Sequence, residues 1–307
     1  MLEVTPKEEF NEKVFYMKNP IPKVAAIHDI SGFGRSSLSV VLPILSTMGI
    51  QVAALPTAVL STHSQFPDYK FVDLTEHLMG FIDHWKAIDI EFDAIYSGFL
   101  GSEKQIEIVK HFITTFKRKH QLVVVDPVLG DDGELYSPFK NIGITEQMKV
   151  LIRDANIITP NITEAALLLG KKYVSKISEK EIVLWAKELS TMGPQTVIIT
   201  SVTDNEAKCS SVIAYNSVDK RCWKVTCDYL PANYPGTGDA FTSVIVGALL
   251  KGDSLPIALD RAVQFVSMGI RATFGYDYNQ MEGFLFERVL GTLSAPVLRS
   301  SYQLLEV

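Results

Sequence analysis

The sequence predicts an α/β protein in which helices cover both faces of a central, mostly parallel sheet. Short apolar runs alternate with longer amphipathic segments along most of the chain, which is the βαβα order of such folds. The run Leu-Val-Val-Val at 122–125 is rich in β-branched residues, which is typical of a strand buried on both faces. No Gly-, Pro- or Ser-rich linker and no repeat of solenoid length interrupts the chain. We therefore expect a single domain over residues 23–307.

Each element is predicted from an apolar run and the turn residues that bound it. Strands are expected at 24–27, 52–60, 92–96, 122–125, 156–159 and 196–199, followed by an antiparallel pair at 210–215 and 223–227. Helices are expected at 37–48, 74–85, 103–116, 163–169, 178–189 and 237–250, with further helices towards the C-terminus. Gly49 is suited to end the first helix in the left-handed conformation. Because ligands in open α/β sheets bind beyond the carboxyl ends of the strands, the residues just after each run are the candidates for function.

Composition excludes several classes of protein. The formal net charge is −6, and no basic stripe of the kind that binds nucleic acid is visible. The most basic run, 117–120, falls at a predicted helix end, where cations complement the helix dipole. No apolar stretch is long enough to span a membrane, and residues 1–22 form an N-terminal extension without an apolar signal core. The three cysteines fit no zinc spacing, so we expect reduced thiols and a cytoplasmic protein.

The segment Pro-Gly-Thr-Gly-Asp-Ala-Phe at 235–241 is the strongest local signal for chemistry. Gly236 and Gly238 let the backbone turn tightly, and the N-terminus of the predicted helix adds the positive end of a dipole. Together with Thr237 they would form an anion hole suited to a phosphoryl group. Asp239 lies in the first helical turn, where we expect the dipole to keep it ionised, so that its position makes it a base. The alternative is an ordinary helix start.

This tetrapeptide, Gly-Thr-Gly-Asp at the start of a late helix, resembles the signature of the ribokinase-like kinases. The resemblance implies that Asp239 deprotonates the substrate hydroxyl, and that the backbone of Gly236, Thr237 and Gly238 stabilises the transferring phosphoryl group. It also implies the ribokinase-like fold, with ATP and Mg²⁺ as cofactors, a response to K⁺ and a homodimer. The sequence contains no Walker A pattern, which excludes a P-loop kinase.

Three further segments resemble the same superfamily, in its order along the chain. Residues 28–34 resemble its N-terminal substrate loop; a dinucleotide fingerprint is the competing interpretation, but Ser37 takes the place of the third glycine. Asp126-Pro-Val and the following Asp131 resemble the Asp-Pro-Val segment of vitamin kinases, with both carboxylates near the nucleotide's Mg²⁺. The alternative for that segment is a turn after a strand.

Residues 159–164, Thr-Pro-Asn-Ile-Thr-Glu, resemble the superfamily's Thr-Pro-Asn-x-x-Glu motif. The resemblance implies that Thr159, Asn161 and Glu164 act around the cation and the phosphates. The alternative is a capping box with Asn161 as cap and Glu164 three residues later, and both can hold. Thr200 and Ser201 match the position of nucleotide-contacting hydroxyls.

Two segments bear on the substrate. Residues 57–66 resemble a stretch of the pyridoxal kinases, which would place Thr57 and His63 near the ring of a B6 vitamer. Residues 97–102 also resemble these kinases, with Phe99 in place of Tyr, so that stacking on the ring would survive. Asp29 instead stands where pyrimidine kinases have Asp. The expected substrate is therefore a B6 vitamer, phosphorylated on its 5′-hydroxymethyl group, with hydroxymethylpyrimidine or non-catalytic binding as alternatives.

Overall fold

The computed structural model describes residues 19–136, 143–204, 208–297 and 300–306. Within these residues ten strands form one sheet, in the order β12-β11-β10-β9-β8-β5-β4-β1-β2-β3. Their bounds are β1 Lys23–Ser31, β2 Gln51–Leu60, β3 Phe71–Asp73, β4 Ala94–Ser97, β5 Leu122–Val125, β8 Ile157–Ile158, β9 Thr196–Asp204, β10 Cys209–Asn216, β11 Arg221–Asp228 and β12 Gln303–Leu305. Most of the expected extension, residues 1–18, lies outside the described part of the chain.

The centre of the sheet is parallel and its edges are antiparallel. Strands β2, β1, β4, β5, β8 and β9 run parallel to one another. At one edge β3 pairs antiparallel with β2, and at the other β10, β11 and β12 continue antiparallel from β9. The mostly parallel sheet predicted from the apolar runs is confirmed, as is the antiparallel pair at 210–215 and 223–227.

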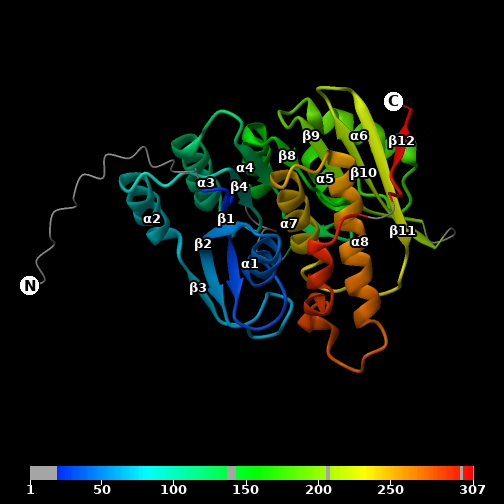
Figure 1. Cartoon of the computed structure of the whole chain (residues 1–307), viewed down its shortest axis with the longest axis horizontal. Coiled ribbons are helices and arrows are strands. Elements are labelled where there is room, and N and C mark those ends of the chain that lie inside the picture. The colour runs from blue at the N-terminus through cyan, green and yellow to red at the C-terminus, as the bar shows by residue number, and fades with distance from the viewer. Residues whose placement is uncertain (1–18, 137–142, 205–207, 298–299, 307) are drawn as a thin grey trace, which may run out of the picture.

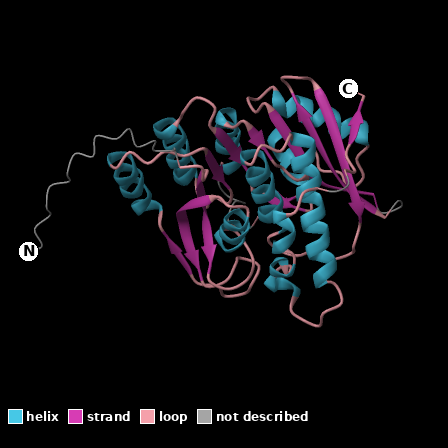
Figure 2. Ribbon diagram, viewed as in Figure 1, coloured by secondary structure: helices cyan, strands magenta, loops and turns pink. Residues whose placement is uncertain are grey.

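Helices cover both faces of the sheet (Figures 1 and 2). One face packs against α2 Thr75–Ala87, α3 Glu103–Phe116, α4 Ile144–Leu151, α5 Ile162–Leu169 and α6 Glu179–Ser190. The other packs against α1 Leu38–Thr47, α7 Thr237–Leu250 and α8 Leu255–Thr273, which lie in front of the sheet in Figure 1. Alternate residues of β1 serve the two cores: Ala25 and Ile27 belong to the first, Val24 and Ala26 to the second. This division explains why the central strands read as continuous apolar runs.

Large side chains anchor both cores. Phe112 on α3 and Phe265 on α8 are at most 1% exposed, and full burial of such a side chain contributes about 1.5–3 kcal/mol relative to leaving it in water. Gly49 follows α1 with a φ of +78°, which confirms the predicted left-handed helix end. No helix in the described ranges is both long and apolar enough to cross a membrane.

The first strand differs from its prediction in a way that matters for the site. It runs to Ser31 rather than ending at Ile27, because its later residues still pair with β2. The pairing register shifts between His28 and Ile30, which places Asp29 at an irregularity of the β-bulge kind. Such irregularities change the direction of a side chain and are frequent beside active sites. Residues 28–31 are thus part of a strand, and not of the loop that the sequence suggested.

Some elements carried too weak a signal to be predicted. They are the short strands β3 and β12, the helix α4, and a hairpin of β6 Gly130–Asp131 with β7 Glu134–Leu135. The β6–β7 hairpin lies directly after the Asp-Pro-Val segment, and Asp131 belongs to it.

Candidate active site

A cavity of about 630 Å³ lies beyond the carboxyl ends of the parallel strands, within the size range of small-molecule sites. Its wall contains every site residue predicted from the sequence except Thr57. These residues are Asp29, His63, Phe99, Asp126, Asp131, Thr159, Asn161, Glu164, Thr200, Ser201, Gly236, Thr237, Gly238 and Asp239. A smaller cavity of about 380 Å³ is lined by residues around the start of β1, Lys23 among them, and contains none of these side chains.

The N-terminus of α7 opens into the cavity without a side-chain cap. Gly236 is the N-cap residue, with a φ of +80° that L side chains rarely adopt. A Cβ atom at Gly236 would lie 2.2 Å from the carbonyl oxygen of Arg35, so only glycine fits here. A Cβ at Gly238 would have the Asp126 carboxylate as its nearest neighbour, at 4.0 Å, so this residue leaves space free between the helix and that acid. The N–H groups of the first helical turn have no partners within the helix and are suited to an anion.

Asp239 lies in that first turn, beside the start of α1. Its Oδ2 atom accepts a hydrogen bond of 2.8 Å from the backbone N–H of Ser37. Although part of the residue faces the cavity, burial of the carboxyl raises its pKa to about 7, with a smaller contribution from the charge of Asp29. The sequence led us to expect that the helix dipole keeps Asp239 ionised at neutral pH without a raised pKa. Burial instead raises its pKa to about 7, because desolvation outweighs the Ser37 hydrogen bond that favours the charge.

Two further buried acids line the same cavity, and one of them, Asp126, interacts with the charge of Asp239. Asp126, at the end of β5, is 6% exposed, and burial together with the charge of Asp239 raises its pKa to about 7. Hydroxyls of Thr159 and Thr242 act in the opposite direction. Burial, followed by the charge of Asp126, raises the pKa of Glu164 well above its ordinary value. Asp131 is exposed, on β6 at the cavity wall.

The charge of the cavity suits a divalent cation. Among the described residues its wall carries five carboxyl groups and no lysine or arginine. Burial, and then mutual repulsion, raises the pKa values of Asp126 and Glu164, and a shared positive ion would stabilise their charged forms. In the described ranges no three His, Cys, Asp or Glu side chains form a complete cage for a metal. A wall with these five carboxyl groups suits Mg²⁺, which usually takes one or two carboxylates and completes its shell with water and substrate phosphates.

Two of its own side chains cap the N-terminus of α5. The Oδ1 atom of Asn161 accepts from the N–H of Glu164, and the Oε2 atom of Glu164 accepts from the N–H of Asn161, both at 2.8 Å. The predicted capping box is thus confirmed. Its members also hold the loop after β5, because Glu164 Oε1 accepts from the N–H of Leu129 and Asn161 Nδ2 donates to the carbonyl of Gly130. Thr200 and Ser201 complete this side of the cavity, and Ser201 has an unusual φ of +60°.

The opposite side of the cavity contains Asp29, His63 and Phe99. Asp29 is 4% exposed, and its Oδ1 atom accepts from the hydroxyl of Ser37 at 2.5 Å. Burial raises the pKa of Asp29 to about 6. Burial lowers the pKa of His63, whose Nε2 atom contacts the carbonyl of Met281, so the ring is neutral at pH 7. Phe99 is half-buried on the wall.

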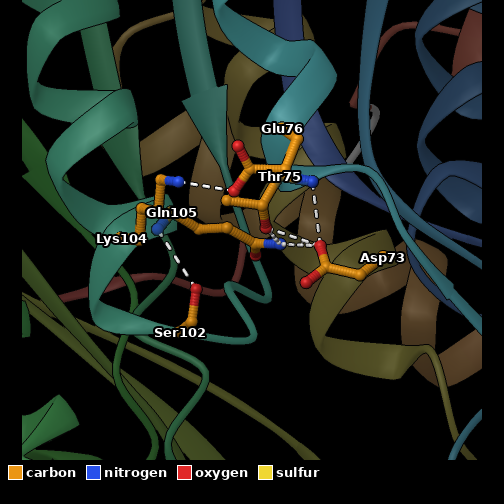
Figure 3. Close-up of polar contacts among 6 residues, drawn as sticks. All are labelled: Asp73, Thr75, Glu76, Ser102, Lys104 and Gln105. Carbon is orange, nitrogen blue, oxygen red and sulfur yellow. Dashed lines mark hydrogen bonds and ion pairs between the residues drawn. The ribbon is translucent and has the colours of Figure 1, made fainter.

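Thr57 lies behind the wall rather than on it. Thr57 is fully buried, and its hydroxyl has no hydrogen-bond partner among the described residues. Its carbonyl accepts from the Nε2 atom of Gln105 at 3.2 Å. Gln105 also bonds Asp73 and Thr75, as Figure 3 shows.

The same glutamine reaches the cavity wall, since its Oε1 atom accepts from the N–H of Gly101 at 2.7 Å. Thr57 therefore belongs to a layer that supports the wall.

Sequence reasoning missed other residues of the wall. They include Ser37, Gln65, Tyr69, Tyr136, Asn233 and Tyr234. None stands in a motif whose chemistry could be deduced from spacing. Ser37 came to notice only as the residue that spoils a dinucleotide fingerprint, whereas in the structure it contacts both Asp29 and Asp239.

Known proteins resemble this chain over most of its length. A model of the phosphomethylpyrimidine kinase family matches residues 77–283. A Bacteroides thetaiotaomicron protein, provisionally assigned as a phosphomethylpyrimidine kinase and crystallised with pyridoxal, is 53% identical over 93% of this chain and 100% of its own, with a TM-score of 0.89. The pyridoxal kinase of Lactobacillus plantarum is 31% identical, over 89% of this chain and 96% of its own, with a TM-score of 0.81.

A third relative extends the comparison to plants. The pyridoxal kinase of Arabidopsis thaliana is 28% identical over 265 residues, which is 81% of this chain and 83% of the plant protein. The ribokinase-like fold that the motifs implied is confirmed by these neighbours.

Proposed function

The chain belongs to the phosphomethylpyrimidine kinase family, and from this premise we propose that it transfers the terminal phosphoryl group of ATP to the 5′-hydroxymethyl group of a vitamin B6 vitamer. One observation carries the proposal: Asp239, the uncapped start of α7 and the acids Asp126 and Glu164 meet in the cavity that also contains Asp29. The relatives support this choice of substrate, since two are named pyridoxal kinases and a third was crystallised with pyridoxal.

Asp239 would act as the general base. Its carboxylate accepts the proton of the hydroxymethyl group as the alcohol oxygen bonds to the γ-phosphorus, and the bond between that phosphorus and the β–γ bridging oxygen breaks. The products are ADP, the 5′-phosphate and the proton held on Asp239. A pKa of about 7 suits this step, because a base works best when its pKa lies near the operating pH. The N–H groups of Gly236, Thr237 and Gly238 would donate to the transferring phosphoryl oxygens.

Asp126, Asp131 and Glu164 would act around Mg²⁺, one or two of them binding the ion directly and the others through water, with phosphate oxygens completing its shell. The ion would supply positive charge that lets ATP enter an acidic cavity and that neutralises the phosphoryl group in transfer. Thr159 and Asn161 would support the cation and phosphates, and Thr200 and Ser201 would contact the nucleotide. A response to K⁺ remains part of the proposal through resemblance alone.

The ring of the vitamer would bind between Asp29, His63 and Phe99. The Asp29 carboxyl could accept from a protonated ring nitrogen or from the amine of pyridoxamine. Neutral His63, whose Nε2–H donates to the Met281 carbonyl, can accept from a ring hydroxyl through Nδ1, and Phe99 offers a face for stacking. Thr57, which lies behind the wall, would support this pocket through its neighbours.

A hydroxymethylpyrimidine kinase is the second candidate. Asp29 favours it, and so does the name of the matching family. The segment around His63 and the relative crystallised with pyridoxal favour a B6 vitamer. A binding protein without turnover is disfavoured by the intact Asp239 in the cavity.

The deciding experiment measures ADP release with Mg²⁺-ATP and K⁺ against pyridoxal, pyridoxamine, pyridoxine and hydroxymethylpyrimidine. Strong turnover of at least one B6 vitamer with weak turnover of the pyrimidine supports the proposal and ranks the vitamers. Turnover of the pyrimidine alone would replace the proposal by the second candidate. Turnover of none would favour a sugar or a binding role.

We also propose that the protein is a cytoplasmic homodimer. The exposed side chains of Val59, Phe71 and Val72 lie on β2 and on the edge strand β3, where a second copy could cover them. The cytoplasmic location is proposed because three cysteines, an odd number with no zinc spacing, fit reduced thiols better than a disulfide framework. Light scattering coupled to size exclusion would measure the mass, and a monomer at micromolar concentration would contradict the dimer.

A further inference from the structure

Ser37 occupies an unusual position between the two carboxyl groups of the site. It is the N-cap residue of α1 and is 4% exposed. Its backbone has a φ of +53° and a ψ of −133°, a conformation that glycine tolerates and other residues rarely adopt. Residues in such conformations cluster at functional sites, where surrounding contacts hold them in place.

The hydrogen bonds of Ser37 explain what holds it there. A serine at an N-cap normally turns its hydroxyl to the N–H groups of its own helix, but Ser37 makes no such bond. Its hydroxyl donates instead to Oδ1 of Asp29 at 2.5 Å, and its N–H donates to Oδ2 of Asp239 at 2.8 Å. A single residue thus contacts the acid expected to bind the ring and the acid expected to act as base.

These two carboxyl groups repel each other when both are charged, and each of the two bonds from Ser37 lowers the pKa of the carboxyl it reaches. The two donors of Ser37 therefore favour the charged form of both groups at short range. Because both bonds start from one residue, they also fix where Asp29 lies relative to Asp239.

We propose that Ser37 is a positioning residue for phosphoryl transfer: by holding Asp29 through its hydroxyl and Asp239 through its N–H, it sets the ring of the substrate so that the hydroxymethyl group meets the base. The inference rests on the proposed function for the identity of the substrate. In this unusual backbone conformation the hydroxyl and the N–H of Ser37 are directed to two different acids.

Two substitutions separate the hydroxyl from the backbone. Ser37→Ala removes the hydroxyl and keeps the N–H, whereas Ser37→Gly removes the hydroxyl and also relieves the strained φ. In steady-state kinetics we expect kcat/KM for the vitamer to fall about tenfold or more in both variants, the effect of losing one hydrogen bond to a charged group. The KM for ATP should stay within about twofold of wild type, because the N–H still holds Asp239.

Ser39→Ala is the matched control. Ser39 lies two residues along the same helix, and its hydroxyl donates to the carbonyl of Ser31 at 2.6 Å, away from both acids. This variant should show wild-type kinetics for vitamer and ATP alike. Thermal melting of all three variants would show that each is folded at the assay temperature.

Two results would overturn the inference. Wild-type kcat/KM in Ser37→Gly would mean that the hydroxyl positions nothing. An equal loss for vitamer and ATP in both variants would mean a general structural role.

If the wild type phosphorylates hydroxymethylpyrimidine and no B6 vitamer, the proposed substrate is wrong. The loss in kcat/KM for the alcohol and the change in KM for ATP are then compared with the pyrimidine as substrate. If no alcohol is phosphorylated, the absorbance of pyridoxal gives its Kd instead, and equal Kd values in wild type and Ser37→Ala would reject the positioning role.

Discussion

The helices α5 and α7 begin at the same cavity in opposite ways. At α5, the side chains of Asn161 and Glu164 accept each other's backbone N–H groups and also hold the loop after β5. At α7, Gly236 caps the helix with no side-chain bond, and Asp239 turns to Ser37 rather than to its own helix. Both starts resemble motifs of one superfamily, yet side chains cap only the start of α5.

The difference teaches how to tell a structural helix start from a functional one. A capped start stabilises the fold, and its removal costs about 0.5–2 kcal/mol. An uncapped start leaves its N–H groups for an anion, so a change there should affect catalysis more than stability. Four predictions test that distinction.

The largest effect is expected at the base on α7. Asp239→Asn keeps the shape of the side chain but removes proton acceptance, so kcat should fall about 10²–10⁴-fold. The melting temperature should not drop, because the neutral amide relieves the repulsion from Asp29 and Asp126. Rapid-quench measurement of the phosphorylated product gives kcat, and an unchanged value would remove Asp239 from the role of base.

The next effect is expected at the uncapped start itself. A methyl group at Gly236 would lie 2.2 Å from the Arg35 carbonyl, so Gly236→Ala must shift the turn that supplies the N–H donors. Loss of one such donor lowers kcat about 10²–10³-fold.

The matched control for Gly236→Ala is Gly170→Ala at the other end of α5. Gly170 has a φ of +64° but nothing within 4 Å of its added Cβ. Gly170→Ala should lower the free energy of unfolding by about 1 kcal/mol and leave the kinetics unchanged. Equal kinetic losses in the two variants would show that the α7 start has no special role.

A smaller effect is expected from pH. Asp239 must be charged to accept a proton, and its pKa is raised to about 7, so activity is present above that pH and is lost as the pH falls. The value of kcat/KM should fall about tenfold per pH unit below roughly 7. Asp126, also at about 7, interacts with Asp239, so the apparent value belongs to the pair. A flat profile between pH 5.5 and 8 would contradict this account.

The smallest kinetic effect is expected at the capped start. Asn161→Ala removes the cap of α5 and the bond to Gly130, which should cost about 1–2 kcal/mol and lower the melting temperature by about 2–4 °C. Ser178→Ala is the control for capping alone. The Ser178 hydroxyl accepts from the N–H of Glu181 at the start of α6, which contains none of the predicted site residues. A rise in the KM for ATP only in Asn161→Ala would support its nucleotide role, whereas identical behaviour of the two variants would leave Asn161 as a cap.

The sequence by itself determined the order of the central strands and most of their helices, and all five carboxyl groups of the cavity wall. Apolar runs such as 122–125 are local signals, and parallel strands bring the residues that follow them to one edge of the sheet. The helix start at 236–239 and the capping box at 161–164 are also local, because glycine freedom and side-chain caps act within one turn.

Only the tertiary structure decided which groups touch. Ser37 lies 202 residues from Asp239, so no local pattern predicts their hydrogen bond. The pKa of Asp239 is likewise invisible in a local pattern, because it depends on burial by distant elements. No local pattern shows that Thr57 is fully buried and lies behind the wall. Burial and long-range contacts are properties of the packed chain, and they convert a set of plausible residues into a site of definite geometry.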